Sequence, residues 1–103
     1  MTDETHPLET RVRDVLREVI DPELGLNVVD LGLVYGVVIS GAEVDVALTM
    51  TTPACPLGEQ IARDAEMRVR ALDGVTRATV ALVWDPPWSP ERMNDEARRV
   101  LGW

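Results

Sequence analysis

The succession of strand, helix and strand periodicities in residues 43–84 most limits the folds open to this chain. Apolar residues alternate with polar or small ones over 43–50, a period of two that predicts a half-buried strand. Residues 56–72 repeat apolar side chains at helical spacing, and residues 78–84 alternate again. Since a strand–helix–strand crossover of this length returns to the same sheet, we expect the two strands to share one sheet.

Three further elements complete the expected order. Residues 8–20 carry one apolar stripe, which predicts a helix. The β-branched run 33–39 predicts a strand paired with 43–50 in an antiparallel hairpin, and Gly36 within it indicates a bulge or a close backbone approach. Ser89 and Pro90 are expected to cap and begin a last helix, which Gly102 ends.

These elements predict an α+β fold, a two-layer sandwich in the order α-β-β-α-β-α. Its small three-stranded sheet carries the helices mainly on one face, because Glu43, Asp45 and Thr49 make the other face of the 43–50 strand polar. We expect residues 1–7 to be a loose tail and residues 8–103 to form a single domain.

Charge and composition argue against several classes of function. The net charge of −8 argues against nucleic-acid binding, which depends on neutralising phosphates. No run of about 18 apolar residues is present, so we expect no membrane span. A single cysteine offers no intrachain disulfide, which fits a cytoplasmic location.

The lone Cys55 lies between Pro53 and Pro56, where the 43–50 strand gives way to the 56–72 helix. A thiol at a helix start ionises more easily, and the thiolate is both nucleophile and metal ligand. Thr51 and Thr52 place hydroxyls just upstream. The alternative is that Cys55 is a small buried hydrophobic residue without chemistry.

Asp21 and Glu23 are open to two interpretations. In the simpler one, Asp21 caps a short turn that begins at Pro22. In the other, both carboxylates supply oxygen ligands or a base near Cys55. The loop that follows, residues 26–32, is apolar except for Asn27 and Asp30, which need partners.

Motifs for nucleotide, histidine-dependent and zinc chemistry are missing. Neither glycine-rich phosphate motif occurs. The only histidine, His6, lies in the expected tail, so a Cys–His pair or an ordinary zinc site does not fit this chain. Trp84 and Trp88 flank Asp85-Pro86-Pro87 and form either a recognition surface or a cover over the end of the core.

Three segments, in order and over nearly the whole chain, resemble the motifs of one family of iron–sulfur cluster assembly factors. These segments are residues 21–35, residues 49–57, and residues 84–88 followed by 96–98 and 101–102. The family includes SufT, the phenylacetate-pathway protein PaaD and the eukaryotic cytosolic iron–sulfur targeting subunit. This sequence lacks the cysteine-rich extension of PaaD-type members and the phosphate loop of ATPase-fused members, so it looks like the short SufT-like form.

The resemblance implies a small α+β domain over 8–103 that matures iron–sulfur proteins together with an assembly scaffold or client apoproteins. It implies that Cys55 is the functional cysteine, in a pocket with Asp21, Glu23, Thr51 and Thr52. Cys55, with Asp21 or Glu23, would then be a transient ligand of iron or a cluster.

Clusters are normally held by four thiolates, so we expect none to be bound tightly by one chain. The missing ligands would come from a client, a small thiol or a second copy in a homodimer. Two alternatives stay open: a metal-free adaptor in which Cys55 is structural, and an enzyme in which Cys55 is the nucleophile. The missing histidine base counts against the enzyme.

Overall fold

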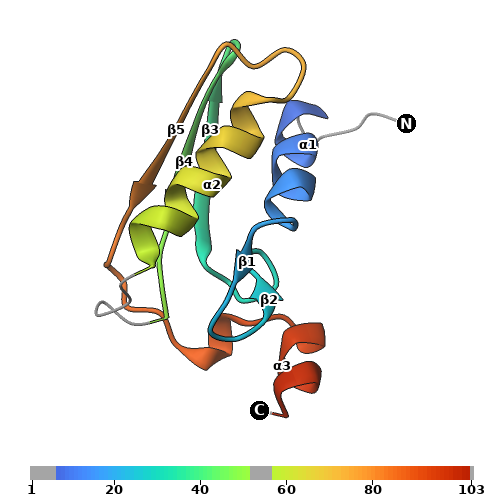
Figure 1. The fold of residues 1–103 in the computed structure, drawn as a ribbon, viewed down its shortest axis with the longest axis vertical. Coiled ribbons are helices and arrows are strands. Elements are labelled where there is room, and N and C mark those ends of the chain that lie inside the picture. The colour runs from blue at the N-terminus through green and yellow to red at the C-terminus, as the bar shows by residue number, and fades with distance from the viewer. Residues whose placement is uncertain (1–6, 52–56, 103) are drawn as a thin grey trace.

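The computed structural model describes residues 7–51 and 57–102, and Figure 1 shows their arrangement. The elements are α1 (Pro7–Leu16), β1 (Ile20–Asp21), β2 (Leu26–Asn27), β3 (Val34–Ser40), β4 (Glu43–Leu48), α2 (Gly58–Arg70), β5 (Arg77–Leu82), a 3-10 turn η1 (Pro90–Arg92) and α3 (Asp95–Leu101). None of the helices in these two ranges has the length and apolar character needed to cross a bilayer.

The main sheet has the order β3-β4-β5 and confirms the predicted crossover. β3 pairs with β4 antiparallel, and α2 returns the chain so that β5 runs parallel to β4. Val34 pairs with Leu48 and Gly36 with Ala47, so Tyr35 is an extra residue in β3. The bulge expected at Gly36 is therefore present.

α1 and α2 lie side by side on one face of this sheet (Figure 1). Along β4, Val44, Val46 and Leu48 are buried beneath the helices, while Glu43 and Asp45 are exposed on the other face. This alternation confirms the two-layer α+β fold.

One residue predicted for the polar face is placed differently. Thr49 is only 1% exposed. β4 ends at Leu48, and the backbone N–H of Thr49 donates to the carbonyl oxygen of Leu33 at 2.8 Å, so the pleat does not continue to Thr49. The predicted strand 43–50 is therefore two residues too long.

The predicted helix 8–20 is wrong at its C-terminal end, because α1 stops at Leu16. Backbone hydrogen bonds between residues three apart continue from the end of α1 to Val19. Ile20 and Asp21 then pair with Asn27 and Leu26 in a second, two-stranded sheet. Val19 and Ile20 have helical spacing but are β-branched and suit a strand equally well. Pro22 also favours an extended conformation at the residue before it.

The predicted start of the last helix is also wrong. Ser89 and Pro90 begin only the short η1, and the Ser89 side chain makes no capping hydrogen bond. The N-cap of α3 is Asn94, whose Oδ1 accepts from the Ala97 N–H at 2.9 Å. Gly102 ends α3 as expected.

The loop after β2 holds this C-terminal segment in place. Asn94 Nδ2 donates to Asp30 Oδ1 at 2.9 Å, and the Asn94 N–H donates to the Asp30 carbonyl oxygen at 3.0 Å. Trp88 Nε1 donates to the carbonyl oxygen of Leu31 at 2.7 Å, and its side chain packs on the core. Trp88 therefore acts as the cover over the end of the core that was one of its two interpretations.

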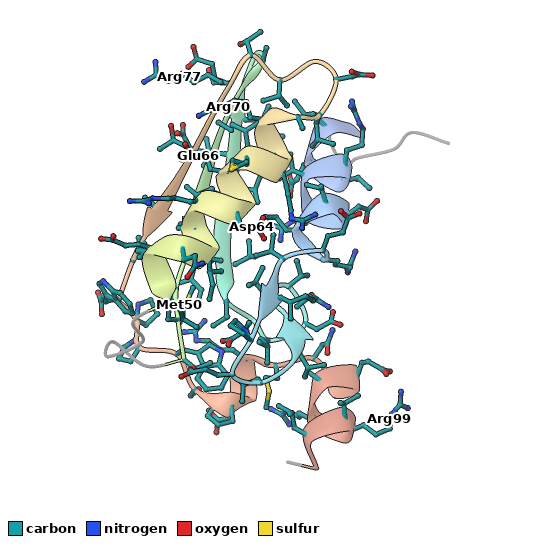
Figure 2. The ribbon with its side chains drawn as sticks, in the orientation of Figure 1. Met50, Asp64, Glu66, Arg70, Arg77 and Arg99 are labelled. Atoms are coloured by element: carbon teal, nitrogen blue, oxygen red, sulfur yellow. The ribbon has the colours of Figure 1, made fainter. Side chains whose placement is uncertain are left out.

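The outer edge of β5 carries a side chain from α2. Glu66 Oε1 accepts from the N–H of Val80 at 3.2 Å, while its Oε2 pairs with Arg70 at 3.0 Å. Figure 2 shows Glu66 and Arg70 projecting from α2 on the side of β5. A carboxylate thus takes the place of a neighbouring strand at this backbone donor.

We predict that Gly32→Ala destabilises the fold by roughly 1–3 kcal/mol more than Gly41→Ala. Both glycines have positive φ, +75° and +61°, and share the strain of a non-glycine residue there. A Cβ on Gly32 would clash with the Arg92 carbonyl oxygen, whereas a Cβ on Gly41 meets nothing within 4 Å. Urea denaturation of both variants measures the difference; equal losses would contradict the close approach.

We predict that Asn94→Ala lowers the free energy of unfolding by about 1–3 kcal/mol, because it removes the α3 cap and the bond to Asp30. The matched variant Ser89→Ala should stay within about 0.5 kcal/mol of wild type, since no capping bond is lost. Thermal denaturation followed by circular dichroism tests the pair. A larger loss of stability in Ser89→Ala than in Asn94→Ala would indicate that Ser89 is the cap.

Candidate functional site

Asp21 organises the turn between β1 and β2. Its Oδ1 accepts from the Glu23 N–H at 2.9 Å, and its carbonyl oxygen accepts from the Gly25 N–H at 2.7 Å. Pro22 fits this arrangement because it has no N–H to place. The turn-capping interpretation of Asp21 is thereby confirmed.

The other oxygen of Asp21 is unusual. Asp21 is 1% exposed, and its Oδ2 is buried without a hydrogen-bond partner within residues 7–51 and 57–102. Leaving a buried acceptor unpaired costs about 1–3 kcal/mol, and more when the group is charged. Holding the turn needs only Oδ1, so Oδ2 is available to a hydrogen-bond donor or a cation.

The other predicted site residues are placed only in part. Glu23 lies in the turn with an exposed side chain, and Thr51 is half-buried just after the buried Met50. Thr52 and Cys55 lie outside the described residues. The structure therefore does not test whether Asp21, Glu23, Thr51, Thr52 and Cys55 form one site.

A backbone ladder connects the Asp21 hairpin to the segment that leads to Cys55. The Val28 N–H donates to the Val19 carbonyl oxygen at 3.0 Å, and the Leu33 N–H donates to that of Val28 at 2.9 Å. Thr49 then donates to Leu33 at 2.8 Å. The hairpin is thereby fixed relative to a residue only two positions before Thr51.

A pocket of about 480 Å³ lies between this hairpin and the start of α2. Ile20 and Pro22, the neighbours of Asp21, line one side. Leu57, two residues after Cys55 in the sequence, lines the other side with Ile61. Residues in or next to the segments 21–35 and 49–57 thus line the same pocket.

The remaining side chains that line the pocket also come from α2. Gln60 and Asp64 complete the lining, and Figure 2 shows Asp64 on the side of α2 that faces β1. Arg68 pairs with Asp64 at 3.1 Å and with Glu18 at 3.1 Å, linking α2 to the segment after α1. These partly exposed ion pairs contribute little to stability but fix the rim of the pocket.

The described residues alone do not build a metal centre. Within residues 7–51 and 57–102, no three His, Cys, Asp or Glu side chains are grouped so that they could hold a metal ion. Any metal bound here would need donors from Cys55 or from another molecule in addition to Asp21. Soft thiolate donors favour iron and its clusters, whereas a lone carboxylate does not select them.

The sequence pattern missed one residue of this region. Ile20 was assigned to the apolar stripe of a helix, but it is 47% exposed on the pocket wall. The available signal was its β-branched side chain next to Asp21, because the residue before Pro22 favours an extended conformation and β-branched residues suit strands.

Comparisons with known proteins agree on one family. A family model described as an iron–sulfur cluster assembly protein matches residues 9–80. A relative from Porphyromonas gingivalis named Fe-S protein maturation auxiliary factor is 38% identical over 99% of this chain and 98% of its own. A relative from Staphylococcus aureus, named Fe-S protein maturation auxiliary factor SufT, is 39% identical over 82% of this chain and 97% of its own.

A solved structure agrees in fold as well as in sequence. The crystal structure of a domain of unknown function, DUF59, from Bacillus anthracis superposes with a TM-score of 0.88. It is 39% identical and covers 92% of each chain.

We predict that Asp21→Ala lowers stability by about 0.5–2 kcal/mol through loss of the turn. If Oδ2 also serves the thiol, the variant should in addition change the rate at which Cys55 is alkylated in the folded protein. Glu23→Ala should cost less than Asp21→Ala, because the turn bond is accepted by the Asp21 side chain and the Glu23 backbone N–H that donates it is kept. Asp45→Ala, an exposed aspartate on the other face of the sheet, is the control. Unchanged alkylation in both site variants would reject the carboxylate site.

Proposed function

This chain belongs to the family of iron–sulfur cluster assembly proteins, and on that premise we propose that it is an accessory factor in cluster assembly or transfer to client proteins. The observation that carries the proposal is the near full-length match to a protein named as a maturation auxiliary factor. The unpartnered buried oxygen of Asp21 adds support, because it lies in a segment that resembles the family's first motif.

In this proposal Cys55 is a transient thiolate ligand of the iron or cluster that is being transferred, which is cargo. Asp21 or Glu23 adds an oxygen ligand or accepts the thiol proton. Thr51 and Thr52 donate hydrogen bonds to the sulfur. Asp21 is the better candidate of the two carboxylates, since its Oδ2 is buried and unpaired among the described residues, whereas Glu23 is exposed.

Ligand counting explains why such a site transfers its cargo. Clusters are normally held by four thiolates, and this sequence contains one cysteine. The remaining ligands come from a second copy, a client or a small thiol. A two-fold dimer supplies two thiolates naturally, because the same patch faces itself. Ligation shared in this way is weak enough for a client's own cysteines to replace it.

The second candidate function is a metal-free adaptor that docks the assembly machinery onto clients. The observation that favours it is that Trp84, at the start of the tryptophan–proline segment, is 42% exposed on a protein of net charge −8, a surface suited to docking a partner. In this case Cys55 is structural, and client binding does not depend on its thiol.

Anaerobic reconstitution with iron and sulfide separates the two functions. We predict that the wild-type protein gains charge-transfer absorption and that Cys55→Ser does not, because serine lacks the thiolate. Native mass spectrometry without added thiol should find cluster mass on the dimer only. Cys55→Ala should behave like Cys55→Ser, and circular dichroism should confirm that both variants are folded.

Two results would count against transient ligation by Cys55. A colourless wild-type protein that still binds clients as tightly as its Cys55→Ser variant would support the adaptor. An intact cluster on a monomer without added thiol would contradict the shared-ligand arrangement.

A further inference from the structure

A second pocket, of about 620 Å³, shares no lining residue with the pocket beside Asp21. Its lining comes from the connector after β5, the bulged start of β3 and Ala47 of β4. Ala47 alternates with Val46 and Leu48, which are buried beneath the helices, so it lies on the other face of the sheet. Figure 1 shows α1 and α2 on one face of this sheet.

The apolar wall of the second pocket includes Val34, Ala47 and Val83, and its charged or aromatic groups are Tyr35, Asp85 and Arg92. We call it the Arg92 pocket. Its volume lies within the range of small-ligand sites, roughly 300–1,000 Å³.

The guanidinium of Arg92 is held in place although the side chain is exposed. Its central carbon lies 4.7 Å from the centroid of the Tyr35 ring, a cation–π contact. The ring is fixed in turn, because the Tyr35 hydroxyl donates to the Pro86 carbonyl oxygen at 2.9 Å. The Arg92 backbone N–H donates to the Ser89 carbonyl oxygen at 3.0 Å.

Arg92 differs in its partner from the arginines that form ion pairs. Arg13, Arg68 and Arg70, for example, each pair with a carboxylate at 3.0 to 3.2 Å. Arg92 makes no ion pair within the described ranges, and its guanidinium lies over the Tyr35 ring instead. A guanidinium stacked on an aromatic ring keeps its in-plane N–H donors available, and their fork matches a carboxylate.

Asp85 lines the same pocket without forming an ion pair to Arg92. Its negative charge opposes a second negative charge on a ligand. The net charge of the protein, −8, adds to this opposition at longer range. A dianion such as phosphate is therefore disfavoured relative to a singly charged carboxylate, while the valines and Ala47 offer an apolar surface beside Arg92.

From these contacts we propose that the Arg92 pocket binds a carboxylate that carries a small apolar group, from either a small organic acid or an acidic segment of a partner protein. The carboxylate pairs with the in-plane donors of Arg92. The apolar group packs on Val34, Ala47 and Val83. The argument for this site does not rest on the proposed function.

The probe for the test is 4-methylpentanoate, titrated into isotope-labelled protein and followed by NMR at the Arg92 side-chain N–H. Its neutral analogue 4-methylpentanamide and inorganic phosphate are titrated in parallel. We expect saturable shifts with the carboxylate only. Equal binding of the amide would leave only an apolar pocket, and equal binding of phosphate would leave only general anion binding; either result overturns the proposal.

Variants on the two charges should act in opposite directions. Arg92→Gln should weaken binding at least about tenfold, because a hydrogen bond to a charged group is lost. Asp85→Asn should tighten it by up to about fivefold, since an exposed repulsion is removed. Arg77→Gln, an exposed arginine at the start of β5, is the matched control and should bind like wild type.

Folding is checked by the amide spectrum of each variant. If Arg92→Gln is not folded, Arg92→Lys replaces it, and binding should still weaken because the fork is lost while the charge remains. Weaker binding in Asp85→Asn, or unchanged binding in a folded Arg92 variant, would overturn the proposal. The source of the carboxylate is tested by comparing a peptide that has glutamate beside leucine with 4-methylpentanoate. Tighter binding of the peptide indicates a partner segment, and tighter binding of 4-methylpentanoate indicates a small acid.

Discussion

The hydrogen bonds of Asp30 join the parts of this fold that the sheet alone leaves separate. Its carboxylate accepts from Asn27 Nδ2 and Asn94 Nδ2, both at 2.9 Å, and lies 4.0 Å from Arg17 Nε. Its N–H donates to Asn27 Oδ1 and its carbonyl oxygen accepts from the Asn94 N–H. One half-buried residue thus connects the segment after α1, the loop after β2 and the start of α3. Removing its carboxylate would leave the donors of two asparagine amides without their acceptor.

Both candidate sites depend on this connection. The Asp21 hairpin ends at Asn27, which Asp30 holds through two hydrogen bonds. The Arg92 pocket lies on the other side of the loop, where Gly32 and Arg92 touch. The first and third family-like segments therefore pack against each other. In this chain the two segments therefore have a structural role that is separate from any chemistry at Cys55.

The fold could be predicted from the sequence wherever a periodicity was both local and unambiguous. The alternation along β4, the apolar stripe of α2 and the crossover to β5 gave the α+β order correctly. The end of α1 was missed because Val19 and Ile20 suit a helix stripe and a strand equally, and only pairing with β2 decides between them. The true cap of α3 was missed because Ser89-Pro90 is a good local start, whereas Asn94 is selected by its distant contact with Asp30.

Of the residues that the sequence proposes for the candidate site, the structure places Asp21, Glu23 and Thr51. For Asp21 the sequence left two interpretations open, a turn cap and a site residue. The hydrogen bond that its Oδ1 accepts confirms the cap. The burial of Oδ2 could not be predicted from the spacing of residues in the sequence. Thr49 was expected on the polar face because alternation was extended past the end of β4. Cys55 and Thr52 lie outside the described residues, so their roles rest on the sequence and the family.

The carboxylate that Glu66 places on the Val80 donor has a further consequence for assembly. An open strand edge is a template for adding another chain, but here the Val80 donor is already bonded to a side chain of the same protein, which makes pairing with a second β5 less favourable. Two copies that share cargo are therefore not expected to join β5 to β5.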